Sequence, residues 1–378
     1  MKKFILKIGI FALSVLYGIM KIFPQDKNRF VFISRQGNKP SVDFQLLEKQ
    51  LKTDIPDCRI FMLCRRFVAT EAGLVGIIGY GFHLLRQMHH IARARVVLLD
   101  TYCIPVSLFN HRGSLLVIQL WHAIGSMKKF GYAMIGKEEG SSMEIAELMH
   151  MHRGYDYMMI SSMRFLKDYL EGFDTIPEKV IEIPLPKADL LTDKAYAKKK
   201  KEEFLRTHPE AQGKKNILYC PTFRKENSRA GEAVQSLVAA MDKTKYNLIF
   251  QPHPLESYGE LPQGVITTTL PTYEVIFAAD YVISDYSSVI YEAGLAGKPI
   301  FAYAYDWEEY SHKREINFDI QNEFPGLFTG SADELLHAIT SGDYDMDRQR
   351  AFIQKNVTMP QNGTCVEALS AFIRSHLK

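Results

Sequence analysis

Short runs of apolar residues recur along the chain, and longer amphipathic stretches separate them. The runs at 29–34, 59–64, 96–100, 115–121, 157–160 and 180–183 predict a first set of β-strands. Stretches at 42–51 and 71–94 predict helices between these strands. Because the apolar runs are continuous rather than alternating, they indicate a parallel sheet that helices cover on both faces.

The same alternation starts again after a charged segment. Pro184 and Pro186 interrupt the chain, and a lysine-rich helix around 198–203 follows. Further strands are predicted at 216–220, 247–251, 265–268, 281–283 and 299–303, with a final amphipathic helix at 365–377. Two doubly wound, Rossmann-like α/β domains in tandem, at 25–187 and 188–378, predict a GT-B fold in which the domains face a central cleft.

Residues 1–24 have a different character. The stretch from Phe4 to Phe23 is almost wholly apolar, with Lys7 and Lys21 inside it. A helix of about 20 residues matches the thickness of a bilayer core. We expect a helix that lies in or dips into the cytoplasmic leaflet, with its lysines at the headgroups. A buried N-terminal helix and a single membrane span are the alternatives.

Composition narrows the class of protein further. A chain of 378 residues suits two domains, and its net charge of +3 gives no indication of nucleic-acid binding. Its five cysteines include no CxxC pair, which argues against a disulfide framework or a structural zinc site. The histidine pairs at 89–90 and 150–152 have no carboxylate or cysteine at ligand spacing. We therefore expect neither a metal nor a cofactor.

Ligands of open parallel sheets bind beyond the carboxyl ends of the strands, so polar residues that directly follow a strand are the first candidates. His122 leaves one strand onto a loop of small residues, which suits a general base. Ser126, Lys128 and Lys129 follow it and would bind a phosphate-bearing acceptor. The alternative for His122 is a hydrogen-bonded structural histidine.

Two further candidates follow strands of the second set. Arg224 lies beyond the strand at 216–220, and arginine binds phosphate in a bidentate manner. His253 stands between Pro252 and Pro254, whose rigid backbone suits contact with a leaving phosphate. An ordinary surface salt bridge for Arg224 and a rigid turn at His253 are the alternatives.

The most informative cluster follows the strand at 281–283 and comprises Ser284, Asp285, Ser287 and Ser288. Hydroxyls and backbone N–H groups at the start of a helix near Ser287 predict a pyrophosphate site. Glu292, one turn further on, is placed to reach a ribose hydroxyl. A simple N-cap is the alternative, but it explains only one of the serines.

Together these segments resemble the CDP-glycerol glycerophosphotransferase family, which includes teichoic acid primases and polymerases of Gram-positive bacteria. The resemblance covers roughly residues 28–345. It rests on the segments 32–41, 119–131, 219–224, 253–254, 284–288 and 298–310. It departs from the family at Ala123-Ile124-Gly125, where Gly-Thr-Pro is usual after Trp-His, and at 184–189, where Gly-x-Pro-Arg-Asn-Asp is usual.

The resemblance implies a GT-B transferase that is attached peripherally to the cytoplasmic face of the membrane. Its donor would be CDP-glycerol or CDP-ribitol, and its acceptor a lipid-linked saccharide or a polyol-phosphate chain. His122 would then act as the base, His253 would assist the leaving group, and Ser287 and Ser288 would hold the donor in the C-terminal domain. The alternatives are a nucleotide-sugar glycosyltransferase and a membrane-bound partner that keeps the fold without the chemistry.

Overall fold

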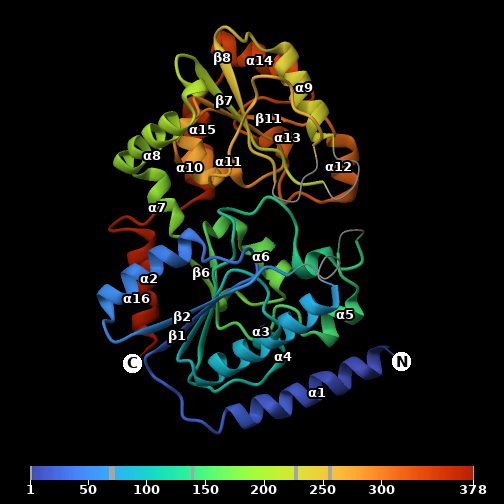
Figure 1. The fold of residues 1–378 in the computed structure, drawn as a ribbon, viewed down its shortest axis with the longest axis vertical. Helices are drawn as coiled ribbons and strands as arrows, with labels where there is room; N and C mark the ends of the chain where they lie inside the picture. Colours follow the sequence, from blue (N-terminus) through green and yellow to red (C-terminus); the bar gives the residue numbers. More distant parts are fainter. Residues whose placement is uncertain (1, 68–72, 138–139, 225–228, 254–257, 378) are drawn as a thin grey trace. The chain divides into compact units, whose positions relative to one another are not determined.

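The computed structural model describes residues 2–67, 73–137, 140–224, 229–253 and 258–377 (Figure 1). The chain forms two compact units. Unit 1 comprises Met1–Ala123, Phe130–Lys187 and Thr358–Lys378, and unit 2 comprises Ile124–Lys129 and Ala188–Val357. The expected boundaries, 25–187 and 188–378, differ from these units at 124–129 and at 358–378.

The core of unit 1 is a six-stranded parallel sheet with the order β2-β1-β3-β4-β5-β6. Side chains of β1, β3 and β4 are buried along their whole length, as expected of a sheet with both faces covered. The strands are β1 (Arg29–Ser34), β2 (Arg59–Cys64), β3 (Val96–Leu99), β4 (Leu116–Gln119), β5 (Tyr157–Ile160) and β6 (Val180–Glu182).

Helices surround this sheet, and one of them comes from the far end of the chain. They are α1 (Lys2–Met20), α2 (Val42–Asp54), α3 (Gly73–Arg93), α4 (Ile104–Leu108), α5 (Met143–Leu148), α6 (Leu166–Phe173) and α16 (Cys365–Ser375). The C-terminal helix α16 lies beside α2 (Figure 1), where the Ser370 hydroxyl donates to Asp54 at 2.5 Å. This packing explains why 358–378 belongs to unit 1.

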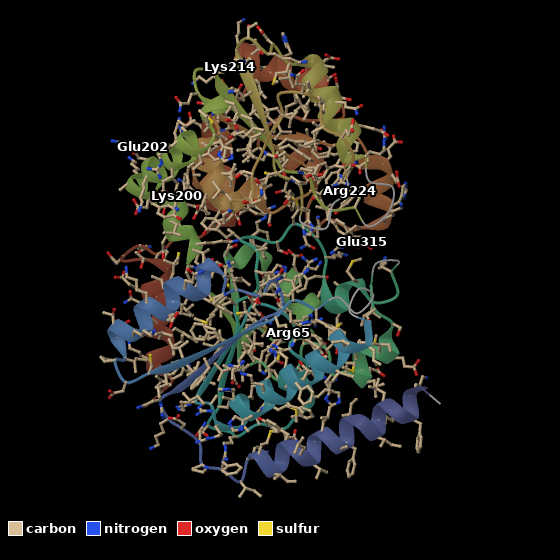
Figure 2. The ribbon with its side chains drawn as sticks, in the orientation of Figure 1. Arg65, Lys200, Glu202, Lys214, Arg224 and Glu315 are labelled. Atoms are coloured by element: carbon tan, nitrogen blue, oxygen red, sulfur yellow. The ribbon has the colours of Figure 1, made fainter. Side chains whose placement is uncertain are left out.

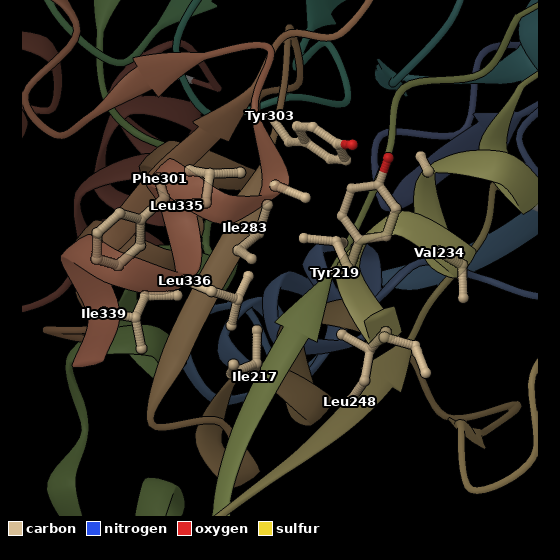
Figure 3. Close-up of a cluster of buried hydrophobic side chains, with 14 of the residues drawn as sticks. Ile217, Tyr219, Val234, Leu248, Ile283, Phe301, Tyr303, Leu335, Leu336 and Ile339 are labelled. Atoms are coloured by element: carbon tan, nitrogen blue, oxygen red, sulfur yellow. The ribbon is translucent and has the colours of Figure 1, made fainter. Parts of the chain in front are cut away.

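Unit 2 has a second six-stranded parallel sheet, with the order β12-β11-β10-β7-β8-β9. Its strands are β7 (Lys215–Tyr219), β8 (Tyr246–Phe250), β9 (Ile266–Thr267), β10 (Tyr281–Ser284), β11 (Ile300–Tyr303) and β12 (Phe328–Thr329). One face of the sheet packs on α9 (Ala230–Ala240) and α14 (Ala332–Ser341) through a cluster that includes Ile217, Leu248, Ile283 and Leu335 (Figure 3). The pattern of apolar runs did not predict β12, which is too short to form one.

The helices of unit 2 vary in length. They are α7 (Lys187–Thr192), α8 (Lys194–Thr207), α9 (Ala230–Ala240), α10 (Thr272–Val275), α11 (Val289–Leu295), α12 (Trp307–Lys313), α13 (Ile320–Glu323), α14 (Ala332–Ser341) and α15 (Met346–Asn356). The lysine-rich run lies on α8, where Lys200 pairs with Glu203 at 3.0 Å and with Glu274 at 3.1 Å.

The apolar N-terminal stretch forms α1, which lies alongside α3 (Figure 1). Large apolar side chains of α1 remain exposed, among them Phe4, Ile8, Phe11 and Val15. Over the described residues, no helix has the length and apolar character needed to cross a membrane.

Candidate functional site

In unit 1 the order of strands reverses between β1 and β3, and ligands of such sheets bind at this kind of point. His122 lies at the same edge, after β4. Its Nδ1 is 3.1 Å from the Asp100 carbonyl oxygen. Since a carbonyl can only accept, Nδ1 carries the hydrogen and Nε2 keeps its lone pair. This is the tautomer that a base acting through Nε2 requires.

The environment of His122 favours a neutral ring. Part of the side chain is exposed, yet desolvation by the surrounding protein lowers the pKa of His122 to about 4. The Asp100 carbonyl opposes this shift and Lys187 adds to it. Solvent at the exposed surface moderates the shift without reversing its direction. At neutral pH the imidazole is therefore able to accept a proton.

The backbone before His122 is held in an unusual conformation. Strand β4 ends at Gln119, short of the expected 121, because Trp121 has a φ of +62°. The Trp121 N–H donates to Gln119 Oε1 at 3.0 Å, and the indole packs against Phe130 with ring centroids 4.7 Å apart. A strained turn of this kind costs about 1–3 kcal/mol and is characteristic of functional sites.

Asp100 is a polar group that the sequence analysis missed, because we counted it as the last residue of an apolar strand. Its side chain is 4% exposed, and among the described residues its Oδ1 has no hydrogen-bond partner. Burial raises the pKa of Asp100 to about 7, against the opposing effect of the Ser34 and Thr101 hydroxyls. A carboxyl group thus lies beneath the edge of the sheet that carries His122.

In unit 2 the order of strands reverses between β7 and β10. Loops that follow these two strands meet there, because the Thr222 N–H donates to both carboxylate oxygens of Asp285, at 2.9 and 3.0 Å. The predicted candidates Arg224 and Asp285 are therefore brought together, at the position where a doubly wound sheet binds its ligand.

Arg224 forms a buried ion-pair network rather than a surface salt bridge. Figure 2 labels Arg224 in unit 2. Its side chain is 8% exposed. Nη1 is 2.8 Å from Asp285 Oδ2, and Nε and Nη2 are 2.8 and 2.9 Å from the two carboxylate oxygens of Asp306. The guanidinium also lies 5.0 Å from the ring centroid of Tyr310. Because these carboxylates occupy its fork of donors, Arg224 holds the loops at this edge together.

The serine cluster divides into buried and accessible members. Ser284 and Asp285 are fully buried, and the Ser284 hydroxyl donates to the Cys220 carbonyl at 2.7 Å. Glu292 is also buried. Burial raises the pKa of the nearby Cys220 thiol, and the charge of Glu292 raises it further. Ser287 and Ser288 are half-buried.

The helix after this cluster begins later than expected. It starts at Val289 instead of near Ser287, and the Ser288 side chain does not cap it. The Ser287 hydroxyl accepts the Val289 N–H at 3.4 Å. The helix α11 has seven residues, and the pyrophosphate site expected at its N-terminus stays a prediction.

His253 follows β8, the strand beside β7. Its side chain is exposed, and its ring packs on Phe223 with centroids 5.1 Å apart. Phe223 immediately precedes Arg224, so the two candidates lie at one edge of the unit 2 sheet. Pro254 lies outside the described residues.

The three predicted acceptor-binding residues lie in unit 2 rather than in the N-terminal domain. Asn317 Nδ2 donates to the buried Ser126 hydroxyl at 2.6 Å, and Lys129 Nζ pairs with Glu315 Oε2 at 2.5 Å. The segment 124–129 thereby packs on the loop before α13. These contacts connect positions almost two hundred residues apart, which no local pattern could have predicted.

A metal site was not expected. Across the parts of the chain that the structure describes, no three His, Cys, Asp or Glu side chains form a group suited to hold a metal ion. Independence from metal stays a prediction.

Comparison with known proteins shows the family of this chain. A model of the CDP-Glycerol:Poly(glycerophosphate) glycerophosphotransferase family matches residues 15–373. The chain belongs to this family. Its similarity to the teichoic acid ribitol-phosphate primase of Bacillus spizizenii is 31% identity over 392 residues, covering 100% of this chain and 99% of that protein.

Other members of the family are matched over part of their length. The teichoic acid glycerol-phosphate primase of Bacillus subtilis is 28% identical over 68% of each chain. The ribitol-phosphate polymerase TarK of Staphylococcus aureus is 30% identical, but this chain spans only 57% of it. Among solved structures, the wall teichoic acid polymerase TagF aligns with a TM-score of 0.76 at 17% identity, covering 100% of this chain and 98% of TagF. That likeness supports the two-sheet α/β fold.

Proposed function

We propose that this protein transfers a polyol phosphate from a CDP-polyol to an acceptor hydroxyl in teichoic acid synthesis. The observation that carries the proposal is the family match over residues 15–373. His122, with its neutral ring and available Nε2, supplies the base that such a transfer needs. We assign the acceptor to unit 1 and the donor to unit 2, as in a GT-B enzyme.

The reaction forms a bond between the acceptor oxygen and the β-phosphorus of the donor. The bond from that phosphorus to the bridging oxygen breaks, and CMP leaves. His122 takes the proton of the acceptor hydroxyl, while His253, Ser287 and Ser288 contact the phosphates in unit 2 and stabilise the developing charge. We assign Arg224, Asp285 and Ser284 a positioning role, because other protein groups already bind their polar atoms.

The first experiment determines which polyol phosphate the protein transfers. The resemblance implied CDP-glycerol or CDP-ribitol as donor, and a relative matched over 99% of its length is a ribitol-phosphate primase. We therefore propose that the donor is either CDP-ribitol or CDP-glycerol. Purified protein, a defined lipid-linked acceptor and each CDP-polyol should yield CMP and an acceptor heavier by whole polyol-phosphate units in mass spectrometry. Transfer from UDP-sugars but from neither CDP-polyol would favour the glycosyltransferase alternative.

We further propose that the protein attaches to the cytoplasmic face of the membrane through two helices. The sequence pointed to α1 alone. The first half of α3 also exposes apolar side chains, among them Val75 at 86% and Phe82 at 70%. Large apolar side chains exposed in this number on two neighbouring helices are unusual on a protein surrounded only by water, and lipid tails would cover them favourably.

The α3 contribution can be tested with Val75→Glu/Phe82→Glu. Burying a large apolar side chain contributes about 1.5–3 kcal/mol, so two charges at these positions should release most of the protein from lipid vesicles. Deletion of residues 1–23 should have a similar effect. Vesicle co-sedimentation measures both, with Ile176→Glu as control, because Ile176 is exposed on unit 1 outside both helices. Undiminished sedimentation of the double variant would exclude α3 as an anchor.

A further inference from the structure

The segment 124–129 leaves unit 1 directly after Ala123 and becomes part of unit 2. An isolated antiparallel bridge pairs Lys128 with Ile316, and the Asn317 N–H donates to the Met127 carbonyl at 2.8 Å. Asn317 Nδ2 donates to the Lys128 carbonyl at 3.2 Å. The backbone of Lys128 is thus anchored on both sides to unit 2.

This anchoring directs the side chain of Lys128 toward the reversal point of the unit 2 sheet. Its Nζ donates to Thr222 Oγ1 at 3.3 Å, and it lies 5.4 Å from the ring centroid of Tyr310. Thr222 is the residue whose N–H binds Asp285, so Lys128 lies where the loops after β7 and β10 meet. The side chain is half-buried.

We propose that Lys128 binds the diphosphate of the CDP-polyol donor, an inference that rests on the proposed function. The sequence analysis placed this lysine with the acceptor, in the other domain. The geometry instead groups it with Thr222 at the carboxyl end of β7, where a doubly wound sheet holds a nucleotide.

Lys128 is one of three cations near the carboxyl end of β7, and the contacts of the three differ. The guanidinium of Arg224 is bound by two carboxylates, and Lys129 pairs with Glu315. The ammonium group of Lys128 contacts the hydroxyl of Thr222 and lies near the ring of Tyr310, at the carboxyl end of β7. An ammonium group is a compact charge that binds phosphate well, as phosphate-binding loops illustrate.

Calorimetric titrations of wild-type protein, Lys128→Met, Lys128→Arg and the control Lys245→Met with CDP-ribitol, CDP-glycerol and cytidine test the inference. We expect Lys128→Met to raise the Kd of the CDP-polyols by about 10- to 100-fold, the effect of losing a hydrogen bond to a charged group. Affinity for cytidine, which has no phosphate, should not change. Lys128→Arg should recover most of the loss, and Lys245→Met, which removes an exposed lysine of unit 2 that pairs with Asp242, should bind like wild type.

Two results would overturn the inference while the proposed function stands. One is equal affinity of Lys128→Met and wild type for the CDP-polyols. The other is an equal loss for cytidine and the CDP-polyols, which would indicate a structural lysine whose removal disturbs the whole pocket. Wild-type protein that binds no CDP-polyol would instead overturn the proposed function, and this inference with it.

Discussion

His122→Ala is expected to slow polyol-phosphate transfer by about 10²–10⁴-fold, the usual contribution of a general base. Affinity for the CDP-polyol should remain nearly intact, because His122 belongs to unit 1 and the proposed donor residues belong to unit 2. Rates of CMP release and calorimetric titrations with the donor measure the two quantities. His337→Ala, on the exposed surface of α14, is the matched control and should leave both unchanged.

The pH dependence offers a second test of His122. A base works in its unprotonated form, so lowering its pKa extends the active range toward acid. With the pKa of His122 lowered to about 4, kcat/KM should not fall on account of this residue between pH 8 and pH 6. Loss of donor affinity in His122→Ala as severe as the loss of turnover would contradict the assignment and place His122 in the donor pocket.

Strands that consist of continuous apolar runs could be predicted well from the sequence. The runs at 29–34, 59–64 and 157–160 match β1, β2 and β5, because a continuous apolar run flanked by polar residues has few other ways to be buried. Strand β12 has only two residues and leaves no such signal. The return of α16 to unit 1 depends on contacts such as Ser370 with Asp54, which connect opposite ends of the chain.

For the candidate site, the sequence predicted where polar residues follow the strands better than it predicted what each of them contacts. The rule that ligands bind beyond the carboxyl ends of strands found His122, Arg224 and His253, since it needs only the strand ends. It could not distinguish residues that face a ligand from residues that hold the loops. Arg224 was read as a phosphate ligand because its partner Asp306 lies far along the chain, after β11. The buried Asp100 was missed for a different reason, because it was counted as the last residue of an apolar strand.

The buried network around Arg224 should make this residue important for stability. In Arg224→Met, Asp285 and Asp306 would remain as carboxylates without their common cation, and breaking a buried ion pair in this way costs about 3–5 kcal/mol. The transition of unit 2 in urea should therefore shift to markedly lower concentration, as measured by circular dichroism. Donor binding should weaken as a consequence, because Thr222 and Asp285 would lose their fixed positions.

Two variants distinguish this network from an ordinary surface salt bridge. Arg229→Met removes an exposed pair with Glu232, and such pairs contribute only about 0–1 kcal/mol, so its transition should stay close to wild type. Adding Asp306→Asn to Arg224→Met removes one of the two uncompensated charges and should recover part of the lost stability. If Arg224→Met and Arg229→Met unfold at the same urea concentration, Arg224 does not organise the loops. It would then be free to act as the direct phosphate ligand that its position after β7 first indicated.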